Sequence, residues 1–110
     1  MIYDIVISDQ AEIDLRGIFE YIAFELQAPE NASGQLDRLE ACIMDLDHMS
    51  KRYRQYELEP WKSRGLRVAP VDNYLVLYIP DDDIQVVTII RVMYGGRDVN
   101  TQLNRFTKTK

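Results

Sequence analysis

Cysteine and histidine are almost absent: the chain contains one cysteine, Cys42, and one histidine, His48. A single cysteine cannot form an internal disulfide, and this scarcity is typical of a protein that works in the reducing cytoplasm. A structural zinc site needs several cysteine or histidine ligands at fixed spacings, and these two residues cannot supply them. We therefore expect no disulfide, no bound metal and no cofactor.

Long hydrophobic runs are also lacking. The longest apolar stretches, residues 74–80 and 86–90, fall far short of the roughly 20 residues that a membrane-spanning helix requires. The segment Met1-Ile2-Tyr3-Asp4 lacks the basic start of a signal peptide. The sequence thus predicts a soluble, cytoplasmic protein with no membrane partner.

Basic residues are scarce in the first half of the chain. Residues 1–50 contain eleven acidic residues and two arginines, a net charge of −9. Residues 51–110 contain eleven basic and seven acidic residues, a net charge of +4. Solvated charged faces on both halves are the simple explanation, and a basic working surface on the second half is the alternative. The acidic half favours a basic partner, whose affinity would fall as salt screens the attraction.

The first half predicts a strand and two helices. The 110 residues, 46% of them hydrophobic, fit a single domain over residues 1–110 with one modest core. Residues 2–7 are β-branched and apolar, as in a strand. Asp9 and Glu12 form a capping-box-like pair that begins a helix, and Pro29 interrupts the pattern after about Leu26. Apolar residues recur at spacings of three and four on both sides of this break, which predicts an antiparallel helical hairpin. They are Ala11, Leu15, Ile18, Phe19, Ile22 and Leu26, then Leu36, Leu39, Ile43 and Leu46.

The second half predicts a sheet. Residues 51–62 are polar, aromatic and basic without periodicity, so we expect a long loop. Residues 66–69, 74–79 and 84–93 are rich in β-branched and aromatic side chains, and short turn-forming segments separate them into an antiparallel meander. Residues 100–110 form a polar tail with room for a short helix. The predicted fold class is α+β: an N-terminal strand and an antiparallel helical hairpin packed on a mostly antiparallel four-stranded sheet.

Four segments carry patterns that are more specific than periodicity. Residues 5–23 contain Ala11-Glu12-Ile13-Asp14-Leu15 and end on an aromatic-isoleucine pair. Three later segments follow in order: Leu66-Arg67-Val68, Asn73-Tyr74-Leu75-Val76-Leu77-Tyr78, and Ile89-Ile90-Arg91-Val92-Met93-Tyr94-Gly95-Gly96-Arg97-Asp98. In order and spacing, the four segments resemble the RelE/ParE superfamily of toxins, and the first resembles ParE-type plasmid stabilization proteins. The resemblance covers nearly the whole chain.

This resemblance implies the toxin of a type II toxin-antitoxin system, whose growth inhibition is neutralised by a cognate antitoxin lying along the helical hairpin and the sheet. It leaves two targets. ParE-like toxins inhibit DNA gyrase by binding, whereas RelE-like toxins are metal-independent endonucleases that cut messenger RNA on the ribosome. Gyrase binding is the first hypothesis. The ribosome-dependent messenger-RNA endonuclease and an inactive antitoxin-binding module are the alternatives.

The nuclease alternative requires groups that activate a 2′-hydroxyl, hold the phosphate and protonate the leaving oxygen. The resemblance implies arginines and a tyrosine for these tasks. Arg97 matches the arginine of the last segment, Arg67 follows the predicted loop, and Arg91 and Tyr94 lie on the last strand. Each also has a structural explanation, such as an ion pair of Arg97 with Asp98 or Asp72, an acid that meets Arg91, or packing of Tyr94.

Two positions depart from the nuclease pattern. Leu75 stands where an arginine is expected on the central strand, and Leu103 stands near the expected tyrosine. Neither leucine can hold a phosphate or transfer a proton. These departures favour the binding hypothesis over the enzyme.

Trp61, Lys62 and Arg64, together with Arg67, form a compact basic and aromatic group, of which the first three are singled out here. This composition suits phosphate contact and base stacking, so the three residues are candidate contacts to nucleic acid or to another target. The same composition suits a solvated loop, which is the simpler interpretation.

His48, Glu57 and Glu59 are weaker candidates for proton transfer. His48 titrates near neutrality, but a histidine near a helix end is also favoured by the helix dipole. Glu57 and Glu59 lie two residues apart in the predicted loop, and nothing in the sequence raises their basicity. The acidic run of residues 81–83 lacks the ligand spacing of a cation site and is interpreted as a hairpin turn.

Overall fold

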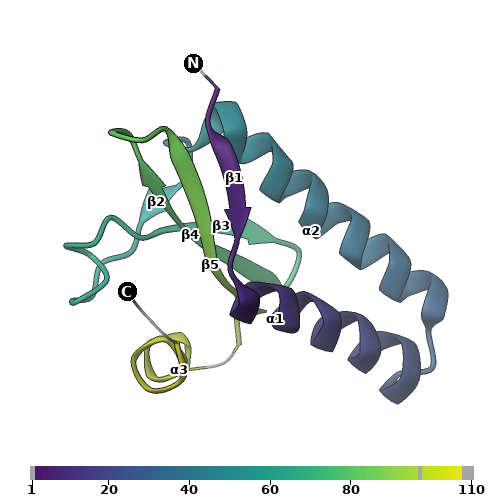
Figure 1. Ribbon diagram of the computed structural model, residues 1–110. Helices are drawn as coiled ribbons and strands as arrows, with labels where there is room; N and C mark the ends of the chain where they lie inside the picture. Colours follow the sequence, from purple (N-terminus) through teal and green to yellow (C-terminus); the bar gives the residue numbers. More distant parts are fainter. Residues whose placement is uncertain (1, 97, 108–110) are drawn as a thin grey trace.

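The chain folds into a five-stranded sheet with a helical hairpin on one face and a short helix on the other (Figure 1). The computed structural model describes residues 2–96 and 98–107. The strands are β1 (Asp4–Ile7), β2 (Arg54–Gln55), β3 (Arg67–Val71), β4 (Tyr74–Asp81) and β5 (Val86–Tyr94). The helices are α1 (Asp9–Glu20), continued by the π-helical turn η1 (Tyr21–Glu25), α2 (Pro29–Met49) and α3 (Val99–Phe106).

The sheet order is β1-β5-β4-β3-β2, in which β1 is parallel to β5 and all other neighbours are antiparallel. The predicted α+β class, the helical hairpin and the β3-β4-β5 meander are therefore confirmed. The sheet has one strand more than predicted. Arg54 and Gln55, which fall in the predicted loop, pair with Val68 and Arg67 and form the short edge strand β2.

The start of α1 corrects the predicted capping pair. Ser8, not Asp9, is the N-cap: its side-chain oxygen accepts a hydrogen bond from the backbone N–H of Ala11 at 3.1 Å. Asp9 and Glu12 lie in the first helical turn, where negative charge is favoured by the helix dipole. The predicted break after Leu26 is present, and Pro29 occupies the first turn of α2.

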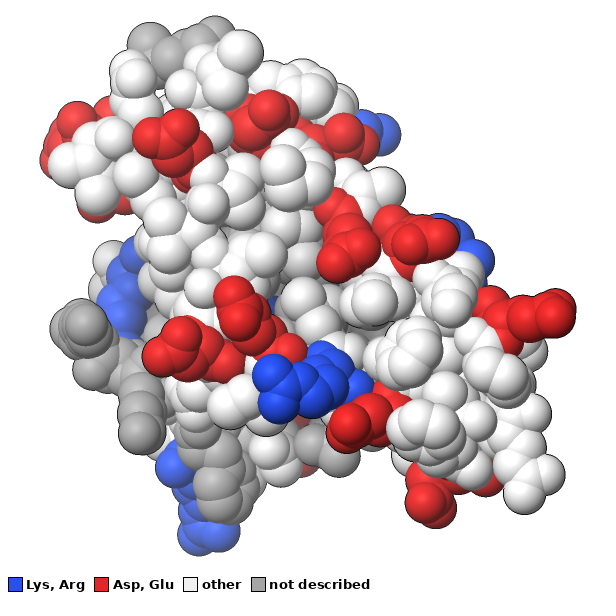
Figure 2. Space-filling model, turned by 45° about the vertical axis from the view of Figure 1, so that its right-hand side comes forward, with Lys and Arg blue, Asp and Glu red and all other residues white. Residues whose placement is uncertain are grey.

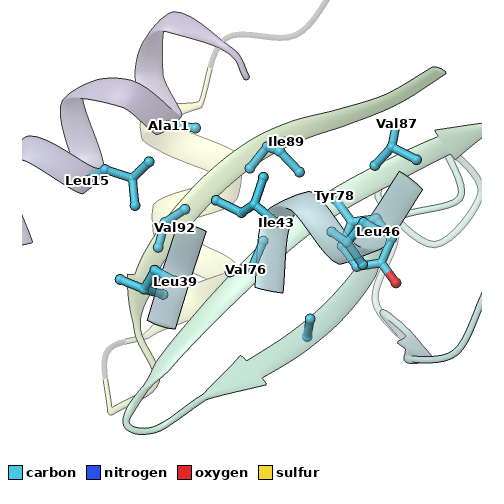
Figure 3. Packing of buried hydrophobic residues seen from close by; sticks show 11 residues of the cluster. Ala11, Leu15, Leu39, Ile43, Leu46, Val76, Tyr78, Val87, Ile89 and Val92 are labelled. Atoms are coloured by element: carbon cyan, nitrogen blue, oxygen red, sulfur yellow. The ribbon is translucent and has the colours of Figure 1, made fainter. Parts of the chain in front are cut away.

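The main core lies between the hairpin and the sheet. Figure 3 shows side chains of α2 pointing at those of β4 and β5. Because side chains alternate between the two faces of a strand, every second residue of the sheet meets the helices. The buried members of this core are Ala11, Leu15, Leu39, Ile43, Leu46, Ala69, Val76, Tyr78, Val87, Ile89 and Val92. Burial raises the pKa of Tyr78, whose hydroxyl donates a hydrogen bond to the carbonyl of Ser50 at 2.8 Å.

A second core lies on the opposite face of the sheet. Residues 56–66 and α3 cover this face and contribute buried side chains to it. The remaining sheet positions need such a cover, because their alternate side chains are apolar. The buried members are Tyr56, Trp61, Leu66, Val68, Leu77, Met93 and Leu103. In the part of the chain that the structure describes, no helix has both the length and the apolar character needed to cross a membrane.

Candidate functional site

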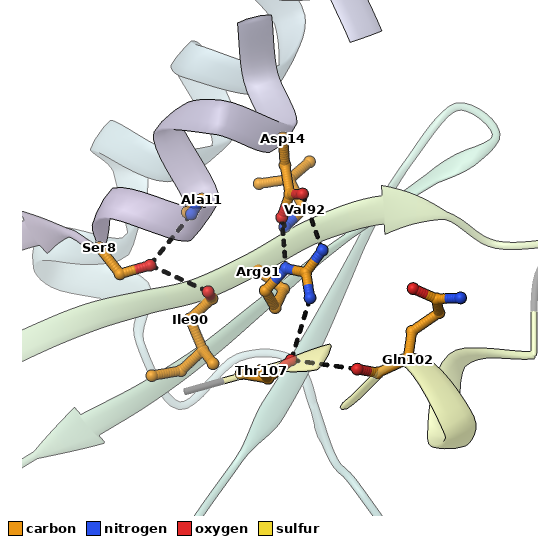
Figure 4. A network of polar contacts seen from close by, with 8 residues as sticks. All are labelled: Ser8, Ala11, Asp14, Ile90, Arg91, Val92, Gln102 and Thr107. Carbon is orange, nitrogen blue, oxygen red and sulfur yellow. Dashed lines mark hydrogen bonds and ion pairs between the residues drawn. The ribbon is translucent and has the colours of Figure 1, made fainter. Parts of the chain in front are cut away.

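Beyond the end of β1, residues at the start of α1 form hydrogen bonds to the edge of β5 that faces away from β4. β1 pairs with Val86–Ile89 only, and the β4–β5 register skips Ile90, which forms a bulge. Ser8 takes over beyond this point: its backbone N–H donates to the carbonyl of Ile89 at 3.1 Å, and its hydroxyl donates to the carbonyl of Ile90 at 2.9 Å. The carboxylate of Asp14 then accepts the backbone N–H of Val92 at 3.0 Å (Figure 4).

Arg91 and Asp14 form an ion pair at this edge (Figure 4). Arg91 Nε and Nη2 donate to the two oxygens of Asp14 at 2.6 and 2.9 Å, and Nη1 donates to Thr107 Oγ1 at 3.0 Å. The side chains of Arg91 and Asp14 are only 11% and 14% exposed. Of the two roles that the sequence leaves open for Arg91, the structure contains the ion pair with an acid. The pair joins β5, α1 and the end of α3.

A groove of about 1090 Å³ opens beside this ion pair. Its walls are α1 and η1, the first half of α2, and the end of β5 with the adjoining start of β4. Apolar and aromatic side chains, which include Ile13, Tyr21, Leu26, Tyr74 and Tyr94, share the lining with charged and amide side chains. The structure therefore provides a concave surface where the hairpin meets the sheet.

Hydrogen bonds between α2 and the turn that joins β3 to β4 fix the rim of the groove. Asp72 accepts hydrogen bonds from Arg38 Nε at 2.7 Å and from Gln35 Nε2 at 3.0 Å. The Arg38 guanidinium, followed by the Gln35 amide, holds the pKa of Asp72 below its usual value. These bonds fix the first half of α2 to the sheet. Figure 2 shows the side on which the hairpin lies, where acidic side chains outnumber basic ones.

Among the described candidates, Arg91 and Tyr94 line the same groove, whereas Arg67 lies apart from Tyr94. Arg67 Nη1 donates to the carbonyl of Tyr53 at 2.7 Å and to that of Lys51 at 3.4 Å. Arg67 on β3 lies opposite Tyr78 of β4, and Tyr94 on β5 lies opposite Tyr74 of β4. Because Tyr74 and Tyr78 are four residues apart, Arg67 and Tyr94 are separated by about 13 Å along the strand direction. Arg97 lies outside the described residues.

The loop candidates divide into one core residue and two surface residues. Trp61 is only 2% exposed, and its Nε1 donates to Asn104 Oδ1 at 3.0 Å. Arg64 lies over the Trp61 ring, with its guanidinium carbon 4.8 Å from the ring centroid. Trp61 therefore packs in the second core, and its ring is not available for the base stacking that composition suggested. Lys62 and Arg64 are exposed.

The proton-transfer candidates lie outside the groove. His48 is exposed and bonds to the carboxylate of the adjacent Asp47. Glu59 accepts bonds from Ser63 N and Oγ at 2.9 and 2.8 Å, which lower the pKa of the Glu59 carboxyl and make it a weaker base. Glu57 is exposed on the same loop. Within residues 2–96 and 98–107, no three His, Cys, Asp or Glu side chains are grouped as metal ligands.

Of the residues that line the groove, only Arg91 and Tyr94 were singled out from the sequence as site candidates. Asp14, Tyr21, Arg38, Asp72 and Tyr74 come from four separate segments. Asp14, Tyr21 and Tyr74 carried a signal, because they belong to the specific patterns of residues 5–23 and 73–78. The two leucines that depart from the nuclease pattern have packing roles: Leu103 is fully buried in the second core, and Leu75 packs against it.

Comparison with known proteins gives one family and a set of similar folds. The family model described as "ParE toxin of type II toxin-antitoxin system, parDE" matches residues 5–99. No curated protein sequence gives a significant match.

Three solved structures illustrate the fold similarity. The chromosomal ParDE toxin-antitoxin system of P. aeruginosa matches with a TM-score of 0.68 and 16% identity, covering 84% of this chain and 96% of that one. The RelBE2 complex of Mycobacterium tuberculosis matches with a TM-score of 0.61 and 22% identity, covering 86% and 99%. A mutant of E. coli toxin RelE in the free state matches with a TM-score of 0.63 and 13% identity, covering 96% and 99%.

Proposed function

Because the chain belongs to the ParE toxin family of type II toxin-antitoxin systems, we propose that it inhibits growth by binding DNA gyrase and that a cognate antitoxin neutralises it. Members of this family are the toxin components of toxin-antitoxin pairs. Gyrase is the target that the ParE-like sequence patterns favour. Three basic residues of the second half, Arg97, Lys62 and Arg64, are the proposed contacts to this target.

The structural contacts of three catalytic candidates support binding rather than cleavage. A metal-independent nuclease must bring a base, an acid and phosphate-binding cations to one phosphate. Here Arg91 is engaged by Asp14, Arg67 by two backbone carbonyls, and Glu59 by Ser63. Side chains that are already engaged in structural contacts are poor candidates for one reaction centre.

The decisive experiment is expression of the chain without its antitoxin. We expect growth arrest, altered supercoiling of a reporter plasmid and intact transcripts, and we expect the purified chain to inhibit gyrase supercoiling in vitro. Codon-phased transcript 5′ ends with normal supercoiling would instead establish the ribosome-dependent messenger-RNA endonuclease. Normal growth with retained antitoxin binding would identify an inactive binding module.

Arg97→Ala tests the proposed target contact. We expect growth inhibition to fall, because a cation that meets the target is lost, while antitoxin binding and folding persist. Arg105→Ala removes an exposed basic residue of α3 and is the matched control. Unaltered toxicity of the Arg97→Ala variant would contradict this contact while leaving the gyrase assay to decide the target.

A further inference from the structure

Arg91 bonds to two helices that lie on opposite faces of the sheet. Its guanidinium donates to Asp14 of α1 with Nε and Nη2, and to Thr107 Oγ1 at the end of α3 with Nη1. The hairpin that contains α1 covers the face with the main core, and α3 covers the face with the second core. Figure 4 shows Asp14 and Thr107 on either side of the guanidinium. One side chain thus connects the two layers at the edge of β5 that faces away from β4.

The helix α3 has eight residues and depends on tertiary contacts for its stability. A helix shorter than about 12 residues is marginal in water, so it forms only where other parts of the protein hold it. Leu103 is fully buried in the second core. Asn100 Oδ1 accepts a hydrogen bond from the Tyr56 hydroxyl at 3.1 Å, and Asn104 Oδ1 accepts the bond from Trp61 Nε1. These contacts fix the side of α3 that faces the second core.

The two ends of α3 are held differently. At the N-terminal end, Asp98 accepts the backbone N–H of Thr101 at 3.2 Å and the hydroxyl of Thr101 at 2.7 Å, so this cap is local. At the C-terminal end, the Thr107 hydroxyl accepts a bond from Arg91 and donates one to the carbonyl of Gln102 at 3.3 Å. A cation is favoured at a helix C-terminus, and a hydroxyl that accepts a bond from a cation is a stronger donor. The last turn of α3 therefore depends on Arg91, a residue of β5.

The position of Arg91 depends in turn on Asp14. The two charged bonds at 2.6 and 2.9 Å hold the plane of the guanidinium, and this plane sets the direction of the remaining nitrogen, Nη1. Asp14 and Arg91 line the groove where the hairpin meets the sheet, whereas Thr107 belongs to the α3 side. A change in the groove that weakens the Asp14–Arg91 pair therefore also weakens the bond to Thr107.

We propose that the Asp14–Arg91 pair controls the docking of α3 from the opposite face of the sheet. When the pair is intact, Arg91 fixes Thr107 and the last turn of α3. When the pair is broken, the guanidinium loses its fixed direction, the bond to Thr107 is lost and α3 undocks more often. Two sites and two states of one element are thereby coupled through a single side chain.

The coupling connects the groove to the surface that we propose to meet gyrase. Asn104 of α3 holds Trp61, and the loop of Trp61 carries Lys62 and Arg64, two of the proposed contacts. Undocking of α3 removes this hold on the loop. The groove is then a control site for the target contacts, separate from the contacts themselves. This consequence rests on the proposed function, whereas the coupling of Asp14 to α3 does not.

Amide hydrogen exchange of the free chain, followed by NMR, measures how often α3 opens. Exchange of α3 that is faster than that of α2 reports local opening rather than global unfolding. Thr107→Val removes the hydroxyl and keeps the shape of the side chain. We expect the amides of α3 to exchange at least about tenfold faster in this variant, the lower end for loss of a hydrogen bond to a charged group.

Asp14→Asn tests the same connection from the groove. Asparagine keeps an oxygen for the Val92 N–H but lacks the charge that holds Arg91. We expect exchange of α3 to become at least about fivefold faster, within the usual range of coupling between separate sites. In the Thr107→Val background the connection is already broken, so Asp14→Asn is expected to change exchange of α3 by less than about twofold.

Two controls separate the connection from changes in charge and in global stability. Glu20→Gln removes a charge from an exposed position of α1 and is expected to leave exchange of α3 unchanged. Ile43→Val weakens the main core, where Ile43 is 1% exposed, and is expected to speed exchange of α2 but not of α3. Unchanged exchange of α3 in Asp14→Asn overturns the proposal, as do effects of Asp14→Asn and Thr107→Val that multiply in the double variant. Equal acceleration of α2 and α3 by Ile43→Val likewise overturns it, because α3 then opens only with the whole domain.

Gyrase inhibition by the same variants tests the consequence for the target contacts. We expect Asp14→Asn and Thr107→Val to weaken inhibition, and the double variant to be no weaker than the weaker single variant. If the wild type inhibits gyrase and these variants inhibit it equally well although α3 opens more often, control of the target contacts is overturned and the gyrase function stands. If the wild type does not inhibit gyrase, the proposed function fails, and hydrogen exchange of the free chain still decides whether Arg91 couples the groove to α3.

Discussion

Replacement of Asp14 by alanine tests whether the edge of β5 is held by α1. The change removes the partner of Arg91 and the acceptor of the Val92 N–H in one step. Both side chains of the ion pair are largely buried, at 11% and 14% exposure, so water can replace the lost contacts only in part. We therefore expect Asp14→Ala to lower the free energy of unfolding by about 3–5 kcal/mol, the usual result of removing one partner from a buried pair.

The double variant Asp14→Ala/Arg91→Ala distinguishes the ion pair from general packing. Once Asp14 is absent, Arg91 is a buried cation without its carboxylate, so its removal costs less in that background than in the wild type. We expect a coupling energy of about 0.5–3 kcal/mol between the two positions. Glu20→Ala, at an exposed acid on the same helix, is the control and is expected to change stability by less than about 0.5 kcal/mol.

Urea unfolding followed by circular dichroism measures all four variants, because a domain of this length usually unfolds in one cooperative transition. The reasoning is refuted if Asp14→Ala costs less than about 1 kcal/mol, below the range for a buried pair. Additive effects of the two single substitutions would likewise show that the carboxylate and the guanidinium do not stabilise each other.

Three further predictions concern stability and pH. Leu103→Ala leaves a cavity in the second core, and we expect urea unfolding to show a loss of about 2–5 kcal/mol. The pKa of Tyr78 is raised above its ordinary value of 10.0 by burial, so its contribution to stability is complete below about pH 10 and is lost as pH rises further. Unfolding at alkaline pH should therefore be less pH-dependent in the Tyr78→Phe variant, and an identical alkaline profile would contradict this. The pKa of Asp82 is lowered from 3.8, first by Lys51 and then by Tyr3, so its contribution is present above that pH and is lost as pH falls. A carboxyl titration followed by carbon NMR should give a midpoint below 3.8 for Asp82, and Lys51→Gln should move the midpoint upward.

The helices and the meander could be predicted because their signals are local. Apolar residues at helical spacing and runs of β-branched residues depend on burial of one face, and this burial is present in the main core. The edge strand β2 could not be predicted in the same way. Its two residues, Arg54 and Gln55, have no apolar pattern and pair only because β3 offers a free edge.

The burial of Trp61 in the second core could not be predicted from local sequence either. Trp61 lies in a polar and basic segment, and this composition suggested a solvated loop or a nucleic-acid contact. In the structure its ring is buried, because one face of β3, β4 and β5 needs a cover and the helical hairpin lies on the other face. Burial of a single aromatic residue in a polar segment depends on tertiary packing, which local composition does not encode.

The candidate site was predictable only where an individual residue belonged to a specific pattern. The sequence left Arg91 with two roles, and it offered no means of choosing Asp14, 77 positions away, as its partner. The groove was not predictable at all, because Tyr21, Tyr74 and Tyr94 become neighbours only after the hairpin has packed on the sheet.

The groove follows from a mismatch in strand length. β1 has four residues and β5 has nine, so the outer edge of β5 continues beyond the end of β1. Ser8 and Asp14 supply hydrogen bonds to the first part of this free edge, and α1 then diverges from the strand toward η1. Past Val92, the wall of the groove is formed by Met93 and Tyr94, which pair with β4 on one side and, among the described residues, with no strand on the other side. A longer β1 would fill this space, so the short strand leaves room both for the contacts of Asp14 with β5 and for the groove.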